Sequence, residues 1–451
     1  MKTSPRTRQK KNTYFLDPFG CVKNQVDAEN MMAHLNNAGW QHTDDAGQAE
    51  LIIVNSCGFI ESAKQESINA VLQWRKLYPE KKILLAGCLS QRYAKELPEI
   101  LTEADGFTGI EDPAKITEKL SSWKTPSADS SGLRKTKTDN LAAGGRPLLS
   151  LPGSAYVKIS DGCSNNCSYC AIPLIRGSLV CRKIPDILTE CKALIKRGIK
   201  ELCVIGQDTG SYVSGLPELL KAISDITENF WVRLLYIHPD HFPLKILDIM
   251  EKDKRFLPYF DIPFQHASEK ILRAMNRHGT SEKYLELINT IRARLPDAVI
   301  RSTFLLGFPG ETDEDFNALL DFQEQAKLDW LGCFAYSREE GTASYSMKNR
   351  VPAKTAVMRK QIIEEKQAAI TEKNMDRFTG KTMDVLIEEQ IDSASDNGKP
   401  VWLGRFYCQA PDIDGSAVII SEKNLQAGTL VKCKVTARRG IDLEALASCD
   451  I

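Results

Sequence analysis

The segment 161-DGCSNNCSYCAIPLIRG-177 places three cysteines, Cys163, Cys167 and Cys170, within eight residues and contains no histidine. A structural zinc site needs four ligands, commonly two CxxC-like pairs or a Cys2His2 set. No second pair follows, because the next thiol, Cys181, comes only after a loop that contains proline and glycine. Three thiolates without a fourth protein ligand instead suit a four-iron cluster that keeps one iron open for a substrate or cofactor.

The position of this trio supports iron–sulfur chemistry. It follows 155-AYVKIS-160, the first of six strand patterns in a series that runs to about residue 336. The other five are ELCVIG, FWVRLLYI, YFDI, AVIRSTFLL and WLGCFAY, with helical segments between them. Six βα units predict an open, partial (β/α)6 barrel of the TIM type, with the trio at the carboxyl end of its first strand, where barrel enzymes keep their chemistry.

The regions before and after this barrel have different patterns. From residue 13 to about 122, the strand patterns TYFLDPFG, ELIIVNS, KKILLAG and GFTGI alternate with helical segments, which predicts a doubly wound parallel sheet. After a helical tract at about 353–376, short strands broken by Gly, Asp and Pro predict a small antiparallel β-barrel. The predicted organisation is a basic tail 1–12, an N-terminal domain 13–125, a linker 126–147, the (β/α)6 domain 148–376 and the small barrel 377–451.

A second set of thiols, Cys21, Cys57 and Cys88, follows three strands of the N-terminal sheet. Free cysteines usually lie scattered in the core, where they pack as small apolar side chains. These three, however, all lie at the carboxyl edge of one parallel sheet, where such sheets bind ligands. Each has a glycine beside it (Gly20, Gly58 and Gly87), which would let a cofactor approach the backbone. The pattern predicts a second cluster with an open iron, in an enzyme that must supply something besides the chemistry of the first cluster, most plausibly sulfur.

Composition is consistent with a folded protein that uses metal or redox chemistry. The 451 residues carry 59 basic and 59 acidic side chains, so any electrostatic preference must be local. Thirteen cysteines, an odd number, do not suggest a disulfide framework. The sequence has no apolar run of about 18 residues and no signal-peptide pattern, so we expect a soluble cytoplasmic protein without a membrane span. Apart from the two trios, the cysteines are interpreted as packing or exposed thiols.

Polar residues at other strand ends are candidates for cofactor binding. They are Gln207 and Asp208 after the second barrel strand, Gln265 after the fourth and Gly307 after the fifth. Each is also compatible with a plain turn, and His266 is as compatible with a structural role as with a functional one. Their common place on one barrel face favours a site.

The CxxxCx(aromatic)C pattern, with Tyr169 before the last cysteine, resembles the radical S-adenosylmethionine (SAM) superfamily. With both trios, the chain is similar along nearly its full length to the radical SAM methylthiotransferases. The segments 20-GCVKNQVDAE-29, 207-QDTGSY-212, 304-FLLGFPGETDEDF-316 and 405-RFYCQAPDIDG-415 most resemble the ribosomal-protein branch, RimO. Val22, the segment GQDTG and Cys181 depart from the branch pattern, and none of these departures removes a cluster ligand.

The resemblance implies two 4Fe-4S clusters and SAM as cofactors, with Tyr169 and the strand-end residues as SAM contacts and no catalytic residue beyond the six cluster cysteines. One SAM would methylate a sulfide on the N-terminal cluster, and a second would yield a 5′-deoxyadenosyl radical. The radical would abstract a β-hydrogen from an aspartate of the twelfth small-subunit ribosomal protein, whose carbon then takes the methylthio group. The C-terminal barrel would be a substrate-positioning TRAM domain. A one-electron reductant and a possible sulfur donor complete the implied partners.

Two other functions remain open. One is a transfer-RNA methylthiotransferase acting at C2 of adenosine, and the other is a non-catalytic iron–sulfur protein that binds RNA. Residues 381–451 hold eight basic and eleven acidic side chains, a net charge of −3. A module that grips RNA phosphates normally has a basic excess, whereas an acidic one suits a basic ribosomal protein. RNA contact is therefore not favoured, and Asp412 and Asp414 are candidate substrate contacts, although a turn role fits them equally well.

Overall fold

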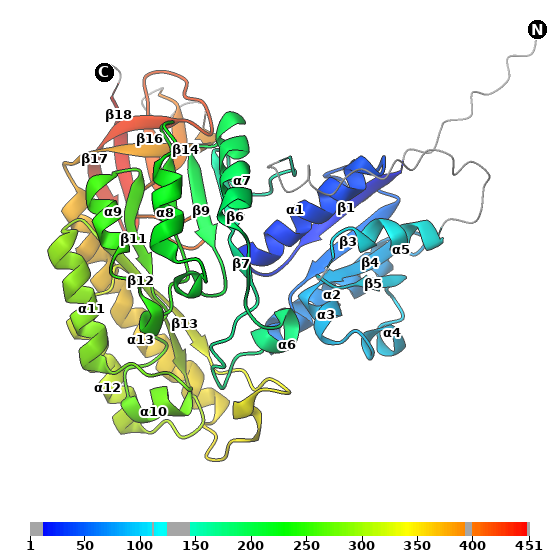
Figure 1. Ribbon diagram of the computed structural model, residues 1–451, viewed down its shortest axis with the longest axis horizontal. Coiled ribbons are helices and arrows are strands. Elements are labelled where there is room, and N and C mark those ends of the chain that lie inside the picture. The colour runs from blue at the N-terminus through cyan, green and yellow to red at the C-terminus, as the bar shows by residue number, and fades with distance from the viewer. Residues whose placement is uncertain (1–11, 111, 124–144, 393–398, 449–451) are drawn as a thin grey trace, which may run out of the picture. The chain divides into compact units, whose positions relative to one another are not determined.

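The fold is described from a computed structural model, which covers residues 12–110, 112–123, 145–392 and 399–448 (Figure 1). The predicted basic tail up to residue 11, most of the predicted linker 126–147, and Cys449 lie outside the described residues. The chain forms two compact units. The first comprises residues up to Leu149 together with Leu174–Gly177, and the second comprises Ser150–Pro173 and everything from Ser178 onward.

The N-terminal unit contains a five-stranded parallel sheet in the order β2-β1-β3-β4-β5. Helices cover both faces, because alternate residues of the apolar strands point in opposite directions: Ile53 packs with the α1 and α5 side, and Ile52 with the α2, α3 and α4 side. The predicted doubly wound sheet is confirmed. Its elements are β1 Thr13–Pro18, α1 Val22–Asn37, β2 Gln41–His42, β3 Leu51–Ser56, α2 Glu61–Leu77, β4 Lys82–Gly87, α3 Cys88–Arg92, α4 Leu97–Ile100, β5 Gly106–Thr108 and α5 Lys115–Trp123.

The second unit is built on a six-stranded sheet in the order β13-β12-β11-β10-β9-β6. All neighbouring strands run parallel, so the predicted (β/α)6 arrangement is confirmed. The strands are β6 Ser154–Lys158, β9 Glu201–Ile205, β10 Trp231–Leu234, β11 Phe256–Asp261, β12 Val299–Leu306 and β13 Trp330–Ala335. The helices between them are α7 Ile184–Lys196, α8 Leu216–Ser224, α9 Ile246–Lys252, α10 Glu269–Ala274, α11 Ser281–Arg294 and α12 Asp313–Ala326, and α13 Ala353–Met375 follows β13 (Figure 1).

Short elements surround the cysteine segment at the carboxyl end of β6. A two-stranded antiparallel pair, β7 Ser160–Asp161 and β8 Val180–Cys181, brackets it, and α6 Ile172–Arg176 lies within it. Two single turns, η2 Thr209–Ser211 and η3 Pro239–His241, follow β9 and β10. The sequence patterns did not predict these elements, because each spans only two to five residues, too few for a recognisable periodic signal.

The C-terminal strands form a closed five-stranded barrel in the order β14-β15-β16-β18-β17. They are β14 Thr382–Asp392, β15 Val401–Phe406, β16 Ala417–Ile420, β17 Leu430–Arg439 and β18 Asp442–Ala447, and 3-10 turns η4 Ala343–Ser346 and η5 Asp376–Phe378 precede them. The predicted small barrel is confirmed, but β16 and β18 pair in parallel rather than antiparallel. A tight turn after β17 reverses the chain, so β18 enters between β17 and β16 and runs in the direction of β16.

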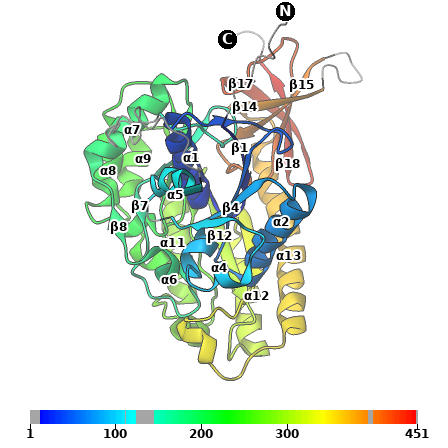
Figure 2. The same cartoon turned by 90° about the vertical axis from the view of Figure 1, so that its right-hand side faces the viewer.

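The small barrel packs on the amino-terminal ends of the strands of the six-stranded sheet, within one compact unit (Figures 1 and 2). Arg405 of β15 bonds to Glu201, the first residue of β9, at 2.7 Å, and to Ser154, the first residue of β6, at 2.9 Å. The cysteine segment lies at the opposite, carboxyl end of the same strands. No helix in the described part of the chain is both long and apolar enough to cross a membrane.

Candidate iron–sulfur and cofactor site

The thiols of Cys163, Cys167 and Cys170 are neighbours in the loop after β7. The backbone N–H of Cys170 donates to the carbonyl of Cys167 at 3.0 Å, which closes a turn between the two. Burial, together with the nearby thiols of Cys167 and Cys163, raises the pKa of Cys170 to about 12. The electrostatic contact among the three sulfurs is what the CxxxCxxC spacing predicts.

The residues fit an iron–sulfur cluster by their donor chemistry. In the described ranges, no group of three or more Cys, His, Asp or Glu side chains is placed so that it could hold a single metal ion. Thiols with a pKa near 12, as at Cys88 and Cys170, ionise at neutral pH only when a cation compensates the thiolate charge. Each trio brings thiols alone, and thiolate is the ligand that iron–sulfur clusters use.

Asp208 anchors the cysteine loop to the ends of β9 and β10. Its carboxylate accepts hydrogen bonds from Asn165 Nδ2 at 2.9 Å and Ser211 Oγ at 2.6 Å, and His241 Nδ1 lies at 2.9 Å. Burial raises the pKa of Asp208, but the hydrogen bonds from these side chains outweigh burial and hold the pKa well below its usual range. Asp208 is therefore a carboxylate at neutral pH, and it fixes the segment between Cys163 and Cys167.

Arg277, which was not among the predicted site residues, fixes the other side of the same loop. The buried guanidinium donates to the Pro263 carbonyl at 2.6 Å and to Tyr169 Oη at 3.3 Å, and it lies 3.9 Å from the Cys167 sulfur. The Tyr169 ring itself packs against the apolar cluster that includes Met275. Tyr169 thus anchors the loop from within the core, and its predicted SAM contact stays a prediction.

Gln207, Gln265 and Gly307 lie after β9, β11 and β12, at the carboxyl edge of one sheet. The Gln207 Nε2 atom is buried and has no hydrogen-bond partner among the described residues, so it can donate to a bound molecule. Gln265 has φ +69° and bridges to Phe304 through backbone pairing. These positions agree with the predicted edge, and their roles in SAM binding stay predictions.

Gly307 is needed for packing as well as for its backbone angle. It has φ +78°, and a Cβ atom there would lie 2.3 Å from the Cβ of Ala356. Its N–H donates to Glu311 Oε2 at 2.7 Å. Glu311 also pairs with Arg359 at 2.6 Å, so a buried carboxylate holds the turn after β12.

His266 belongs to this buried network rather than to an open site. Its Nδ1 accepts the N–H groups of Ala267 and Ser268, both at 3.0 Å, which assigns the proton of the neutral ring to Nε2. That nitrogen lies 3.7 Å from Glu311 Oε2, and the side chain has no exposed surface. This geometry supports the structural interpretation of His266.

Cys21, Cys57 and Cys88 lie at the carboxyl ends of β1, β3 and β4, which are neighbours in the N-terminal sheet. Cys21 is the residue before α1, Cys57 follows β3, and Cys88 begins α3. Burial raises the pKa of Cys88 to about 12, opposed by Arg176 and reinforced by the thiols of Cys21 and Cys57. The other two thiols thus act on the pKa of Cys88, and the role of the three as cluster ligands stays a prediction.

Small residues and one amide hold the three cysteine loops together. A Cβ at Gly20 would lie 3.1 Å from the Cβ of Cys57, and one at Gly58 would lie 2.7 Å from the carbonyl oxygen of Cys88. The Asn24 amide donates to the carbonyl of Phe19, after β1, at 2.8 Å and to that of Ser56, the last residue of β3, at 3.1 Å. Larger side chains at these glycines would force the loops apart, so the glycines serve the approach of the thiols to one another.

The chain was compared with known proteins. Residues 13–109 match the model of the uncharacterized protein family UPF0004, residues 157–322 match the radical SAM superfamily, and residues 379–447 match the TRAM domain. The chain is 47% identical to the ribosomal protein uS12 methylthiotransferase RimO of Treponema denticola, over 96% of this chain and 100% of the relative. The RimO protein of Clostridioides difficile is 40% identical to this chain, over 95% of this chain and 97% of the relative. The chain belongs to the RimO family of ribosomal protein uS12 methylthiotransferases.

Family membership places the chain among radical SAM enzymes, as the cysteine spacing predicted. A solved structure with a similar fold is the radical SAM methyltransferase TsrM of Kitasatospora setae, with cobalamin and a 4Fe-4S cluster bound. Its TM-score is 0.54 at 14% identity, and the match covers 74% of each chain. At that identity the likeness concerns the fold alone.

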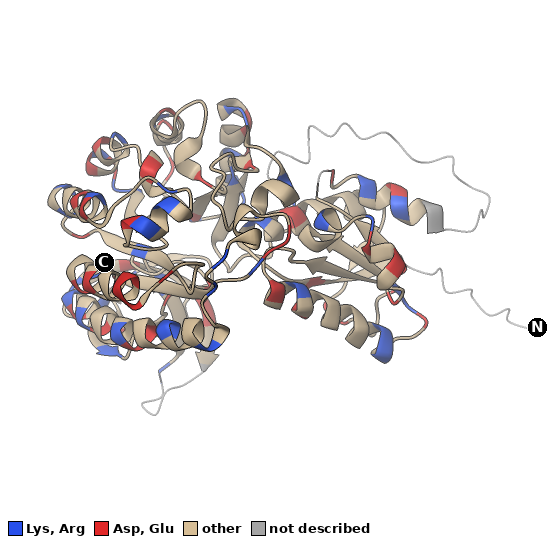
Figure 3. Ribbon diagram, turned by 90° about the horizontal axis from the view of Figure 1, so that it is seen from below, with Lys and Arg blue, Asp and Glu red and all other residues tan. Residues whose placement is uncertain are grey.

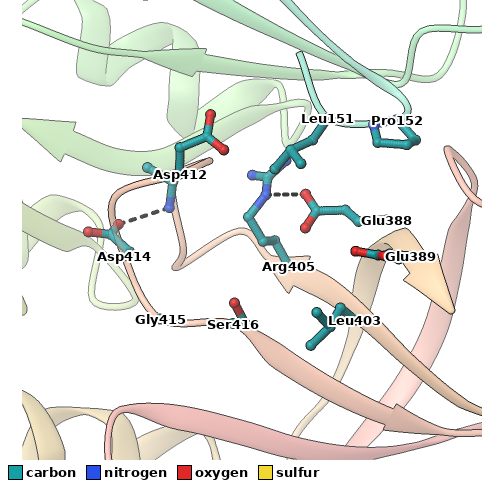
Figure 4. Close-up of a pocket in the computed structure, with 11 residues that line it drawn as sticks. Leu151, Pro152, Glu388, Glu389, Leu403, Arg405, Asp412, Asp414, Gly415 and Ser416 are labelled. Carbon is teal, nitrogen blue, oxygen red and sulfur yellow. Dashed lines mark hydrogen bonds and ion pairs between the residues drawn. The ribbon is translucent and has the colours of Figure 1, made fainter. Parts of the chain in front are cut away.

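The two acidic residues predicted to contact substrate lie in the loop between β15 and β16, at a pocket of the RimO-family TRAM barrel. Figure 4 shows Asp412 and Asp414 at this pocket together with Arg405 and Glu388, which form an ion pair. Asp412 is exposed and has φ +64°, as in a turn, and Tyr156 Oη donates to it at 3.4 Å. Its contact with a substrate stays a prediction.

Asp414 does not fit the predicted surface contact. Only 1% of its side chain is exposed, and it accepts hydrogen bonds from Tyr259 Oη at 2.5 Å and Ala410 N–H at 2.8 Å. Burial raises its pKa to about 6, against the effect of Arg301, whose Nε lies 3.5 Å away. Asp414 is a structural residue between the small barrel and the sheet, and a substrate protein cannot reach its carboxylate without displacing the loop.

The other described cysteines agree with their interpretation as packing thiols. Five are buried and Cys181 is half-buried, its sulfur accepting the N–H of Val213 at 3.5 Å. The buried five are Cys191, Cys203, Cys333, Cys408 and Cys433.

Proposed function

We propose that this chain transfers a methylthio group to the β-carbon of an aspartate in ribosomal protein uS12. The observation that carries the proposal is the presence of two separate thiol trios, each at the carboxyl ends of parallel strands, in a chain of the RimO family. The relatives are named as methylthiotransferases of uS12, and we propose the same substrate for this chain. Methylthio transfer needs both a radical and a sulfur atom, so two thiolate-only sites suit it.

Two groups of residues would hold the cofactors. Cys163, Cys167 and Cys170 would bind one 4Fe-4S cluster, and the thiols of the N-terminal unit a second one. When bound, the clusters would supply the electron for SAM cleavage and the sulfur that is methylated and transferred. The second cluster, the contacts to SAM, a one-electron reductant and a sulfur donor are all part of this proposal.

The residues around Cys163, Cys167 and Cys170 would orient SAM and hold the loop in place. Asp208 and Arg277 fix the loop from two sides, through Asn165 and Tyr169. The unpartnered Nε2 of Gln207 would donate to an acceptor atom of SAM, because a buried donor without a partner is costly. The TRAM loop closes the amino-terminal end of the barrel, opposite the cysteine segment, by burying Asp414 against Tyr259.

The charges of the TRAM barrel favour a protein substrate over RNA. Several of its basic side chains already face carboxylates: Lys381–Asp297, Lys399–Glu422, Lys432–Asp384, Arg438–Asp376 and Arg439–Glu444. Figure 3 shows acidic and basic residues interspersed along the helices of the face it presents. Phosphate binding depends on an uncompensated basic surface, whereas a basic ribosomal protein is steered by carboxylates such as Asp412. A ribosomal substrate would place the reaction in the cytoplasm.

The test uses the full chain, reconstituted anaerobically with iron and sulfide and supplied with SAM and dithionite. It is given a peptide that spans the target aspartate of uS12, intact uS12, and unmodified transfer RNA in separate reactions. We expect mass spectrometry to find one added methylthio group on the peptide or on intact uS12, and none on RNA. A methylthio group on transfer RNA alone would contradict the proposed substrate while leaving the reaction class intact.

A further inference from the structure

Arg176, at the end of α6, lies in the interior of the N-terminal unit beside the thiol of Cys88. The segment Leu174–Gly177 packs with that unit, although it comes only four residues after Cys170 in the sequence. Nη2 of Arg176 lies 3.2 Å from the Cys88 sulfur and 2.8 Å from Oδ2 of Asp27. The guanidinium side chain is 1% exposed and that of Asp27 is 6% exposed. A buried ion pair is costly to desolvate, so its placement against a thiol calls for an explanation.

We propose that Arg176 is a positioning residue for the cluster that Cys21, Cys57 and Cys88 would hold. This inference rests on the proposed second cluster. In it, the guanidinium donates a hydrogen bond to the sulfur of Cys88 and places a fixed positive charge beside the cluster. Asp27, on the first turns of α1, orients the guanidinium so that one nitrogen reaches both the carboxylate and the sulfur.

The physical consequence is a change in how readily this cluster is reduced. Hydrogen bonds to the sulfur atoms, nearby charge and burial are the means by which a protein sets the potential of an iron–sulfur cluster. Reduction adds negative charge, and a buried cation stabilises the more negative state. Arg176 therefore raises the reduction potential of the N-terminal cluster and holds Cys88 in place as a ligand.

A lysine side chain cannot make the contacts that the Arg176 guanidinium makes. An arginine side chain is a planar fork with several donors in fixed directions, whereas a lysine ammonium is a compact point charge. Lysine at 176 would keep the charge but lose the simultaneous contact with Asp27 and Cys88. The segment 161–177 thus carries the ligands of one predicted cluster and the positioning residue of the other.

The experiment isolates the N-terminal cluster by changing Cys163, Cys167 and Cys170 to alanine in the full chain. In this background, Arg176→Gln and Arg176→Lys are compared with the parent. The matched control is Arg146→Lys, because Arg146 is also buried, 3% exposed, and pairs with an α1 carboxylate, Glu29, at 2.7 Å. The readouts are iron content, the midpoint potential from a redox titration followed by electron paramagnetic resonance, and circular dichroism for the fold.

We expect Arg176→Gln to move the midpoint to a more negative potential or to lose iron while the fold is kept. Arg176→Lys should shift it in the same direction by less, and Arg146→Lys should match the parent. A parent-like potential and iron content in both Arg176 variants would overturn the inference. Loss of the fold in both would also overturn it, since Arg176 would then be structural. If the parent variant binds no iron, the proposed N-terminal cluster is wrong, and the role of Arg176 is overturned with it.

Discussion

Glu201 and Arg405 are 204 residues apart in the chain, yet Arg405 Nη2 donates to Glu201 Oε2 at 2.7 Å in the interior. Glu201 also accepts from Arg233 Nε at 2.7 Å, and neither Glu201 nor Arg233 has any exposed side-chain surface. Burial raises the pKa of Glu201, but the two arginines outweigh it and lower the pKa to about 2. One carboxylate thus joins the six-stranded sheet to the TRAM barrel.

Glu201→Gln should destabilise the second unit strongly. Removal of one partner of a buried ion pair leaves charge uncompensated and typically costs about 3–5 kcal/mol. Denaturant unfolding of the parent and the variant measures this loss. Arg438→Ala, which removes a more exposed pair with Asp376, is the control and should cost much less. Equal losses in the two variants would contradict the account of this interface.

Asp414 should give the stability a pH dependence of the opposite sign to that of an ordinary carboxylate. The pKa of Asp414 in the folded protein, about 6, lies above the usual aspartate value of about 3.9. The contribution of Asp414 to the free energy of unfolding is therefore fully present below pH of about 4 and is lost as pH rises through about 6. Asn does not titrate. We expect the unfolding temperature of the parent, relative to Asp414→Asn, to fall over that range. A difference that stays constant with pH would show that the carboxyl is not protonated at its buried position.

Gly307→Ala should damage the turn after β12 more than Gly310→Ala does. Both glycines have positive φ, +78° and +89°, so both changes bring the backbone penalty of about 1–2 kcal/mol. At Gly307 the new methyl group also meets Ala356, and such overpacking typically adds about 1–3 kcal/mol, whereas nothing lies within 4 Å at Gly310. Thermal unfolding compares the two variants, and equal destabilisation would argue against the close packing at Gly307.

Local patterns predicted the fold because they reflect local physics. The run 51-LIIVNS-56 is buried on both faces, as a central parallel strand must be, and the helix pattern at 61–77 coincides with α2. The common edge of Cys21, Cys57 and Cys88 could be predicted because each of them follows a strand, and parallel strands end at one edge. Strand β18 was missed, since Asp442 and Glu444 interrupt the apolar residues of 442-DLEALA-447.

Contacts between distant parts of the chain could not be predicted in the same way. Arg277 meets Tyr169 across 108 residues, and Arg176 meets Cys88 across 88. No period or motif in the sequence marks such pairs. Asp414 was a candidate substrate contact because it lies in a turn of an acidic module, but its loop folds back onto Tyr259 and buries it.

The central claim is that one chain divides radical generation and sulfur insertion between two thiol trios. The most direct measurement follows 5′-deoxyadenosine and methylthiolated uS12 peptide together, in reconstituted Cys57→Ala and Cys167→Ala variants. We predict that Cys57→Ala still cleaves SAM but forms no methylthio product, and that Cys167→Ala does neither. Equal loss of SAM cleavage in both variants, or methylthio product from Cys57→Ala, would contradict the account.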